Sequence, residues 1–169
     1  PYTESDTPGP QGVYAKSKLE GEKMAAKFRK HFVVRTCGLY VASPNGPVRG
    51  RNFVDTMLEL SRERDRLRIV DDQRCTPSYV PHVAKAMLFL LSTSSYGTYH
   101  VVNGDSVSWR EFAAEIFRLA GREVAIEPIT THEYNAAAPR PLYSVLDTSK
   151  YHASPYRPVM PSWQQGIAE

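Results

Sequence analysis

Two side chains near the start of the sequence are spaced for acid–base chemistry. Tyr14 precedes Lys18 by four residues, inside a segment whose apolar residues recur at helical spacing. Residues four apart on a helix lie on one face, so the phenol and the ammonium group are expected to be neighbours. A free phenol has a pKa near ~10, and a nearby ammonium group favours its ionised form. Such a pair can protonate the oxygen of a ketone as hydride arrives, or take the proton in the reverse direction.

The segments that must position this pair alternate between helical and β-rich patterns along the chain. Five segments have helical periodicity or helix-start signals: 13–30, 52–66, 81–91, 108–120 and 161–169. Short β-rich or extended segments lie between them: 32–39, 67–70, 97–102 and 124–129. Turn-forming and polar residues predict three loops: 43–50, 71–79 and 131–141. This alternation favours an α/β fold with a largely parallel sheet.

Two of the predicted helices carry specific start signals. Asn52 is a suitable N-cap for the second helix. Ser108 followed by Glu111 predicts a capping box, and Gly121 is expected to end that helix.

The overall composition is that of a globular domain. The chain has 169 residues, 41% hydrophobic and 23% charged, which is enough to build a core. No apolar run approaches the ~20 residues of a membrane span, and the N-terminal segment lacks the features of a signal peptide. The formal net charge is +3, and the one dense charged run, 62–68, alternates in sign. We therefore expect neither a membrane nor a nucleic-acid partner.

The cysteines and histidines do not predict a metal site. Cys37 and Cys75 show no paired spacing, which favours a reducing, cytoplasmic setting. The five histidines are not spaced like metal ligands, so no metal is expected.

Six later segments follow Tyr14 and Lys18 in an informative order. They are Arg35-Thr36-Cys37 with Leu39-Tyr40, Asn52 to Leu58, Val70 to Gln73 with Thr76-Pro77, Gly97 to His100, Ser108 to Ala113, and Arg140 to Asp147. In this order the chain resembles the dTDP-4-dehydrorhamnose reductase family of extended short-chain dehydrogenase/reductases, over essentially its full length. The resemblance implies the C-terminal half of a Rossmann-type doubly wound sheet plus a small substrate-binding α/β subdomain. The sheet half would comprise about 1–50 and 81–103, and the subdomain about 51–80 and 104–169.

The resemblance also implies roles for the residues near the catalytic pair. Tyr14 would be the general acid, and Lys18 its partner and a ligand of the cofactor ribose. The cofactor would be NADPH or NADH, and the sequence does not decide between them. Thr36, Cys37 and Gly38 would lie beside the nicotinamide ring.

A second set of residues would bind the substrate, a dTDP-sugar nucleotide. The resemblance places six residues against it: Asn52, Phe53, Gln73, Arg74, Thr76 and Arg140. The two arginines are physically suited to a diphosphate, because the guanidinium fork matches phosphate oxygens. The implied activity is NAD(P)H-dependent reduction of a dTDP-4-keto-6-deoxy sugar, from dTDP-4-dehydrorhamnose to dTDP-L-rhamnose.

The sequence departs from the family pattern at several places. It lacks the glycine-rich turn that seats a pyrophosphate and the Ser/Thr of the family's catalytic triad, both of which lie upstream in the family. Gly38 stands where the family usually has Trp, which removes a large stacking surface. The segment from Tyr79 to His82 has no carboxylate where some relatives hold magnesium.

These departures leave alternatives open. The chain is expected to be inactive by itself and to pair with an N-terminal half or with a second copy, because apolar helix faces and a strand edge would otherwise be uncovered. Gly38 keeps another sugar-nucleotide epimerase or dehydratase of the extended family in view. A non-catalytic regulatory subunit resembling the β subunit of methionine adenosyltransferase is the third possibility.

Overall fold

The computed structural model describes residues 1–41 and 51–169, so the predicted loop 43–50 lies outside the described residues. Its helices are α1 (Gly12–Ala25), α2 (Phe53–Glu63), α3 (Val80–Leu91), α4 (Trp109–Leu119), α5 (Thr131–Tyr134), α6 (Ser149–His152) and α7 (Trp163–Ala168). Its strands are β1 (Phe32–Arg35), β2 (Leu39–Tyr40), β3 (Arg66–Val70), β4 (Arg74–Cys75), β5 (Ser78–Tyr79), β6 (Gly97–His100), β7 (Val107–Ser108) and β8 (Ala125–Ile129). The predicted α/β class is confirmed.

The strands of the described residues pair two by two. β1 pairs with β6, β2 with β5 and β3 with β8, all in parallel, whereas β4 and β7 are antiparallel. The prediction of largely parallel pairing is therefore confirmed. Parallel strands need a crossover, and helices supply it here, as α3 does on the way to β6.

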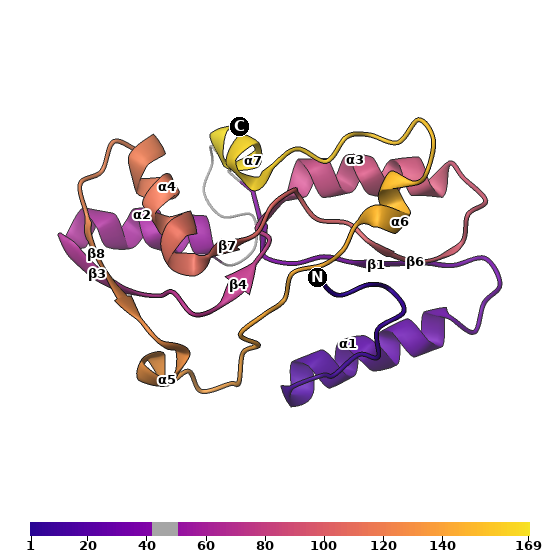
Figure 1. Ribbon diagram of the computed structural model, residues 1–169, viewed down its shortest axis with the longest axis horizontal. Coiled ribbons are helices and arrows are strands. Elements are labelled where there is room, and N and C mark those ends of the chain that lie inside the picture. The colour runs from indigo at the N-terminus through magenta and orange to yellow at the C-terminus, as the bar shows by residue number, and fades with distance from the viewer. Residues whose placement is uncertain (42–50) are drawn as a thin grey trace.

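One layer of the molecule is built on the β1–β6 pair. Figure 1 shows α3 and α6 on one side of these strands and α1 on the other. The first side is a packed core, which contains Val83, Ala86, Leu90, Tyr99, Val101, Tyr151 and Met160. These residues come from α3, from β6 and the segment after it, and from α6 and its C-terminal extension.

A second core lies at the other end of the molecule, where α2 and α4 pack on β3 and β8 (Figure 1). Its buried members are Tyr40, Val54, Met57, Leu67, Ile69, Val107, Phe112, Ala113, Ile116, Phe117 and Trp163. The predicted division into a sheet half and a substrate-binding part stays a prediction. Tyr40, predicted for the sheet half, packs in the second core, whereas Tyr151 and Met160, predicted for the substrate-binding part, pack in the first.

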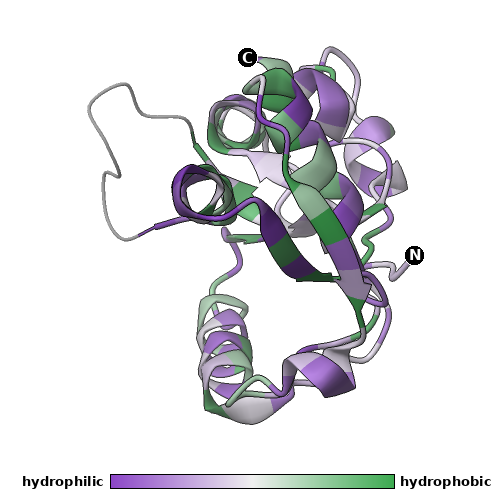
Figure 2. Cartoon of the chain, turned by 90° about the vertical axis from the view of Figure 1, so that its left-hand side faces the viewer, coloured by the Kyte–Doolittle hydropathy of each residue, from purple (hydrophilic) through white to green (hydrophobic). Residues whose placement is uncertain are grey.

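Helix α1 lies to one side of the packed elements (Figure 2). None of its residues is buried, and Phe28, just beyond its end, is 69% exposed. A two-pronged ion pair ties it to β1, with Arg35 Nη2 2.7 Å from Glu22 Oε2. The prediction that this helix extends to residue 30 was wrong. After Ala25 the amides of Lys27 and Phe28 bond carbonyls three residues back, which tightens the chain into turns.

The predicted loops 71–79 and 131–141 contain short elements that the sequence did not reveal. β4 and β5 lie in the first, and α5 lies in the second. Two-residue strands and a four-residue helix are too short to produce a periodic pattern. β7 and α6 were missed for the same reason.

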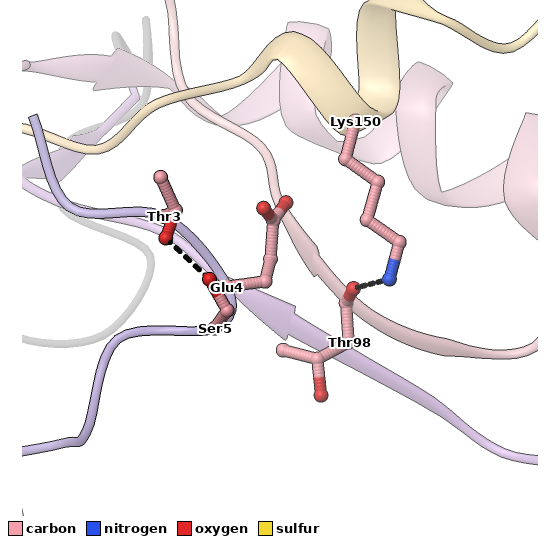
Figure 3. A pocket seen from close by; sticks show the side chains of 5 residues that line it. All are labelled: Thr3, Glu4, Ser5, Thr98 and Lys150. Atoms are coloured by element: carbon pink, nitrogen blue, oxygen red, sulfur yellow. Dashed lines mark hydrogen bonds between the residues drawn. The ribbon is translucent and has the colours of Figure 1, made fainter.

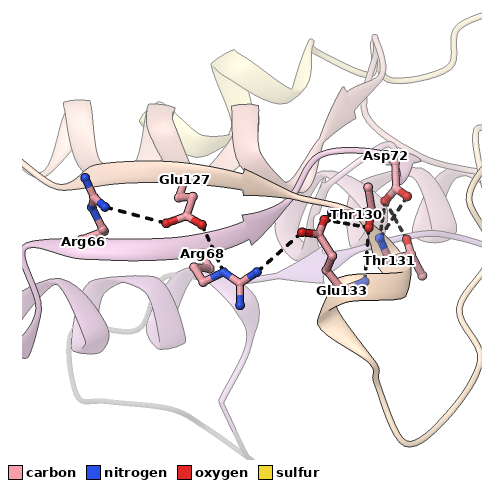
Figure 4. Close-up of polar contacts among 7 residues, drawn as sticks. All are labelled: Arg66, Arg68, Asp72, Glu127, Thr130, Thr131 and Glu133. Atoms are coloured by element: carbon pink, nitrogen blue, oxygen red, sulfur yellow. Dashed lines mark hydrogen bonds and ion pairs between the residues drawn. The ribbon is translucent and has the colours of Figure 1, made fainter.

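Polar contacts fix the second of these segments to the β3–β8 ladder (Figure 4). Thr130 and Glu133 form the capping box of α5, and the Asp72 carboxylate accepts bonds from both the amide and the hydroxyl of Thr131. These bonds hold the pKa of Asp72 below its usual value, chiefly through the Thr131 hydroxyl. Along the ladder, Arg68 bridges to Glu133 at 3.8 Å. The segment after β8 is therefore tied both to β3 and to the loop that follows it.

Within the described ranges, no helix is long and apolar enough to cross a membrane. In the same part of the chain, no three His, Cys, Asp or Glu side chains gather closely enough to hold a metal ion.

Candidate active site

Helix α1 presents the predicted acid–base pair on one face. Lys18 Nζ lies 5.3 Å from the centre of the Tyr14 ring, within cation–π distance. The two side chains are therefore neighbours, as their spacing predicts. Tyr14 is 75% exposed and its phenol is open to a ligand.

A cavity of about 490 Å³ opens beside the N-terminal end of α1. Its wall is formed by the N-terminal segment, the end of β1 and the segment from Pro141 to Leu146. Gln11, the N-cap of α1, and Ala15, one turn further along, contribute to the wall, whereas Tyr14 is not among its lining residues in the described part of the chain. The structure therefore brings the start of α1 to the cavity without turning the phenol into it.

Two of the residues predicted to face the cofactor, Thr36 and Cys37, line this cavity. Thr36 Oγ1 is buried and has no hydrogen-bond partner among the described residues. The same is true of Nε2 of His100, whose other ring nitrogen lies 3.1 Å from the Asp147 carbonyl oxygen. Buried polar atoms are normally bonded, so both atoms have capacity for a ligand atom.

Gly38 has a backbone that suits glycine and little else. Its φ is +54°, and a Cβ atom there would lie 3.1 Å from the Cα of Pro77. The Ser78 amide donates to the Gly38 carbonyl at 3.1 Å, which locks the two segments together. A large side chain at this position would require the backbone to move, which gives the departure from the family's Trp a physical basis.

The side chains of two predicted substrate residues form hydrogen bonds with other parts of the protein. Asn52 caps α2 by accepting from the Asp55 amide at 3.0 Å, and its own amide donates to the Val41 carbonyl at 3.0 Å. Gln73 is buried, donates to Thr131 Oγ1 at 3.0 Å and accepts from the Trp109 indole at 3.1 Å. Both amides thus hold elements in place.

Phe53 and Thr76 are also packed within the protein. The Phe53 ring stacks on Phe112 with 5.7 Å between ring centres, and Trp109 lies against it. Thr76 is only 1% exposed. Substrate contact by these residues stays a prediction, and what the structure shows is their part in the scaffold.

The two candidate diphosphate ligands lie on neighbouring segments. The Arg74 amide donates to the Leu142 carbonyl at 2.8 Å, and the Ser144 amide donates to the Arg74 carbonyl at 2.9 Å. This pairing places the segment that follows Arg140 beside β4. The Arg74 guanidinium donates to the Ser106 carbonyl at 3.1 Å and lies 3.5 Å from Glu111 Oε2. Arg140 is exposed, next to the cavity-lining Pro141.

A second hollow of about 490 Å³ is lined by Thr3, Glu4, Ser5, Thr98 and Lys150 (Figure 3). Its charged groups already have partners. Lys150 Nζ donates to the Thr98 carbonyl at 2.7 Å, and Glu4 accepts from the His100 amide at 2.8 Å. The cavity beside α1 is the stronger candidate site.

Sequence reasoning missed His100 as a cavity residue. The strand 97–102 was predicted, but its end could be assigned to the cavity only after β6 had been paired with β1 in register, with Arg35 opposite His100. No local signal marks such a residue.

Comparison with known proteins identifies the family of the chain. A family model described as the RmlD substrate binding domain matches residues 1–169. The spore coat polysaccharide biosynthesis protein SpsK of Bacillus subtilis is 38% identical over 170 residues, which cover 100% of this chain and 57% of that protein. The dTDP-4-dehydrorhamnose reductase of Streptomyces griseus is 33% identical over 177 residues, covering 100% of this chain and 56% of that protein. The chain thus spans a little over half the length of these relatives.

Solved structures give the same result. The crystal structure of dTDP-4-dehydrorhamnose reductase from Bacillus anthracis in complex with NADP matches with a TM-score of 0.90 and 40% identity, covering 98% of this chain and 57% of that one. The reductase from Clostridium acetobutylicum matches with a TM-score of 0.90 and 37% identity, covering 99% of this chain and 57% of that one. Because the family model, the curated relatives and the solved structures agree over nearly every residue, this chain belongs to the RmlD substrate binding domain family, which its dTDP-4-dehydrorhamnose reductase relatives represent.

Proposed function

We propose that the protein carrying this chain reduces the 4-keto group of a dTDP-4-keto-6-deoxy sugar with NADPH, converting dTDP-4-dehydrorhamnose into dTDP-L-rhamnose. The observation that carries the proposal is the family match over residues 1–169 with Tyr14 and Lys18 adjacent on one exposed helix face. The choice of NADPH over NADH follows the NADP bound by the Bacillus anthracis reductase.

The chain's own contribution to the reaction is proton transfer and positioning. The phenol of Tyr14 donates its proton to the C4 oxygen of the sugar as that oxygen gains negative charge. The ammonium group of Lys18, beside the ring, favours the phenolate that remains and bonds the ribose of the cofactor. NADPH, when bound, supplies the hydride that reduces C4.

The residues present at the cavity suit a polar ligand such as the nicotinamide end of a dinucleotide. Thr36 and Cys37 line the wall, and the unbonded Thr36 Oγ1 and His100 Nε2 offer hydrogen-bonding capacity. A bound amide or hydroxyl would satisfy these atoms, which are costly to leave unpaired.

The sugar nucleotide would lie between the cavity and the arginines on β4 and near Pro141. Arg140 is exposed there and Arg74 is partly exposed, so both can reach a diphosphate without unfolding any element. Asn52, Phe53, Gln73 and Thr76 would act by shaping this surface, with direct contact following only a local rearrangement.

A polypeptide limited to these 169 residues is proposed to be inactive by itself. It has no glycine-rich turn for the cofactor pyrophosphate, and the relatives it matches are nearly twice as long. Its partner would be the N-terminal half found in those relatives, or a second copy of the chain.

A second candidate is an epimerase of a related sugar nucleotide, and Gly38 is the observation that favours it. Without a side chain at this position, the wall beside the cofactor residues lacks the family's stacking surface. An epimerase returns the hydride and so consumes no net NADPH.

The test is NADPH oxidation by the protein at its natural length, with dTDP-4-dehydrorhamnose as substrate and the product sugar analysed. The proposal expects one equivalent of NADPH to be oxidised for each dTDP-L-rhamnose formed. Interconversion of sugar nucleotides without NADPH loss would instead establish the epimerase, and no reaction with intact binding would favour a non-catalytic subunit.

A further inference from the structure

The two cysteines of the chain, far apart in sequence, meet at one edge of the cavity. Residues after β1 run beside residues after β4, because Leu39 pairs with Ser78 in register and the Ser78 amide bonds the Gly38 carbonyl. This pairing places Cys37 and Cys75 on adjoining segments, and the Cys75 thiol is the neighbouring group that most lowers the pKa of Cys37.

Cys37 Sγ has groups near it that can donate a hydrogen bond. The Cys75 thiol and the Thr76 backbone both lower the pKa of Cys37. The Ser144 hydroxyl lies 3.5 Å away and can donate to the sulfur or to the Arg74 carbonyl at 3.3 Å. Donors gathered on one sulfur stabilise the thiolate, which is the nucleophilic form of cysteine. The pKa of Cys37 is accordingly lowered to about 6, mainly by the Cys75 thiol and against the opposing effect of burial.

The two thiols differ in access to solvent. Cys37 is half-buried and lines the cavity of about 490 Å³, so small molecules can reach it. Cys75 is 2% exposed and is not among the described residues that line this cavity. One thiol is thus placed to react first and the other to react only with its neighbour.

We propose that Cys37 and Cys75 form a peroxide-sensitive dithiol, in which Cys37 is oxidised first and Cys75 then closes a disulfide with it. The proposal rests on the placement of the thiols and is independent of the reductase activity. The ligand class is a small hydroperoxide, with hydrogen peroxide as the simplest member.

The chemistry balances in two steps. The Cys37 thiolate attacks one peroxide oxygen, the O–O bond breaks, and the departing hydroxide takes a proton to become water, which leaves Cys37 as a sulfenic acid. Cys75 loses its proton and attacks that sulfur, the S–O bond breaks, and a second water leaves. Together the thiols lose two protons and two electrons, and the peroxide takes them up to become two waters.

The test treats the reduced protein, at its natural length, with stoichiometric hydrogen peroxide and maps its peptides by mass spectrometry without reduction. We expect a peptide pair joined through Cys37 and Cys75, which dithiothreitol separates. The Cys75→Ser variant is expected to stop at a Cys37 sulfenic acid that dimedone traps. The matched Cys37→Ser variant is expected to leave Cys75 as a free thiol.

A measurement on the unmodified protein guards against variants that fail to fold. Iodoacetamide at neutral pH is expected to label Cys37 at least about tenfold faster than Cys75 in the folded protein, and the difference is expected to vanish in urea. Equal labelling in the folded protein would overturn the proposal. So would peroxide treatment that leaves both thiols free, or that oxidises Cys37 without joining it to Cys75.

Discussion

At the scale of single residues, Cys37 has a pKa well below that of an ordinary thiol. Hydrogen bonds from Cys75, Ser144 and the Thr76 amide lower its pKa to about 6, although burial acts in the opposite direction. The same contact raises the pKa of Cys75, because its proton is held between the two sulfurs and the site is buried.

The lowered pKa predicts the pH profile of Cys37 alkylation. Since the thiolate forms above the pKa, the rate should rise through about pH 6 and level off near roughly pH 7 to 8, whereas in urea it should keep rising towards the ordinary value near ~8.5. Asp6, Arg35 and His100 line the same cavity, so their side chains contribute to the electrostatic field around Cys37. The profile is measured with iodoacetamide and peptide mapping. Superimposable profiles for folded and unfolded chains would contradict the assignment.

At the scale of elements, Ser108 joins the start of α4 to the end of β3. Its hydroxyl accepts from the Glu111 amide at 3.1 Å and donates to Asp71 Oδ1 at 2.5 Å. Losing the cap costs about 1 kcal/mol, and losing a hydrogen bond to a carboxylate costs about 1.5–3 kcal/mol. Ser108→Ala should therefore lower the free energy of unfolding by about 2–4 kcal/mol.

The matched control for that prediction is Ser92→Ala. The Ser92 hydroxyl is exposed at the end of α3 and, among the described residues, bonds only the Phe89 carbonyl, so the change should stay within about 0.5 kcal/mol. Urea unfolding followed by circular dichroism measures both variants. Equal midpoints for the two would show that the capping box does not stabilise the junction.

The same junction should weaken in acid. Burial raises the pKa of Asp71, but the hydrogen bonds from Ser108 and Arg110 outweigh it and hold the pKa below its usual value. A carboxylate with a depressed pKa stabilises the fold above its unfolded pKa, and that contribution is lost as the pH falls through the folded value. Stability should therefore drop below about pH 4, and Asp71→Asn should reduce the drop. If the Asp71→Asn variant loses as much stability in acid as the unmodified protein, Asp71 is not the source of the acid sensitivity.

The caps of α2 and α4 were predictable because the signal is local. Asn52 and Ser108 each bond a backbone amide three residues later, and both residues of such a pair can be read from adjacent sequence. The short strands β4, β5 and β7 were not predictable, since each exists only through its partner. The likeness to the reductases also singled out Thr36 and Cys37, which line the cavity, and their contact with a cofactor stays a prediction. The proximity of Cys37 to Cys75 depends on the pairing of β2 and β5.

Gln73 shows a further limit of reasoning from sequence. A polar side chain in a loop after a strand is typical of a binding residue, and the family likeness favours that role. The structure places its amide between Thr131 and Trp109, where it joins the loop to α5 and α4, and its contact with a substrate stays a prediction. Whether a side chain bonds the protein or a ligand depends on which elements pack around it.

At the scale of the whole molecule, the exposed apolar side chains of α1, of the turn after it and of α3 offer surface that a partner could cover. Val13, Met24, Phe28, Leu88 and Leu91 are all exposed. Apolar patches of this kind mark contact surfaces. A polypeptide of these 169 residues should therefore elute in light-scattering chromatography above its monomer mass of 19.0 kDa. A sharp monomer peak at micromolar concentration would contradict this expectation.

The central claim is that this chain carries the proton donor of a sugar-nucleotide reductase, and one measurement tests it most directly. It compares kcat for NADPH oxidation with dTDP-4-dehydrorhamnose in the natural-length protein carrying Tyr14→Phe or Tyr156→Phe. Tyr156 is exposed and lies outside the residues lining the cavity, so its variant should retain wild-type kcat. Tyr14→Phe should lower kcat by roughly 10²- to 10⁴-fold, because the general acid is lost. Wild-type turnover in Tyr14→Phe would contradict the account.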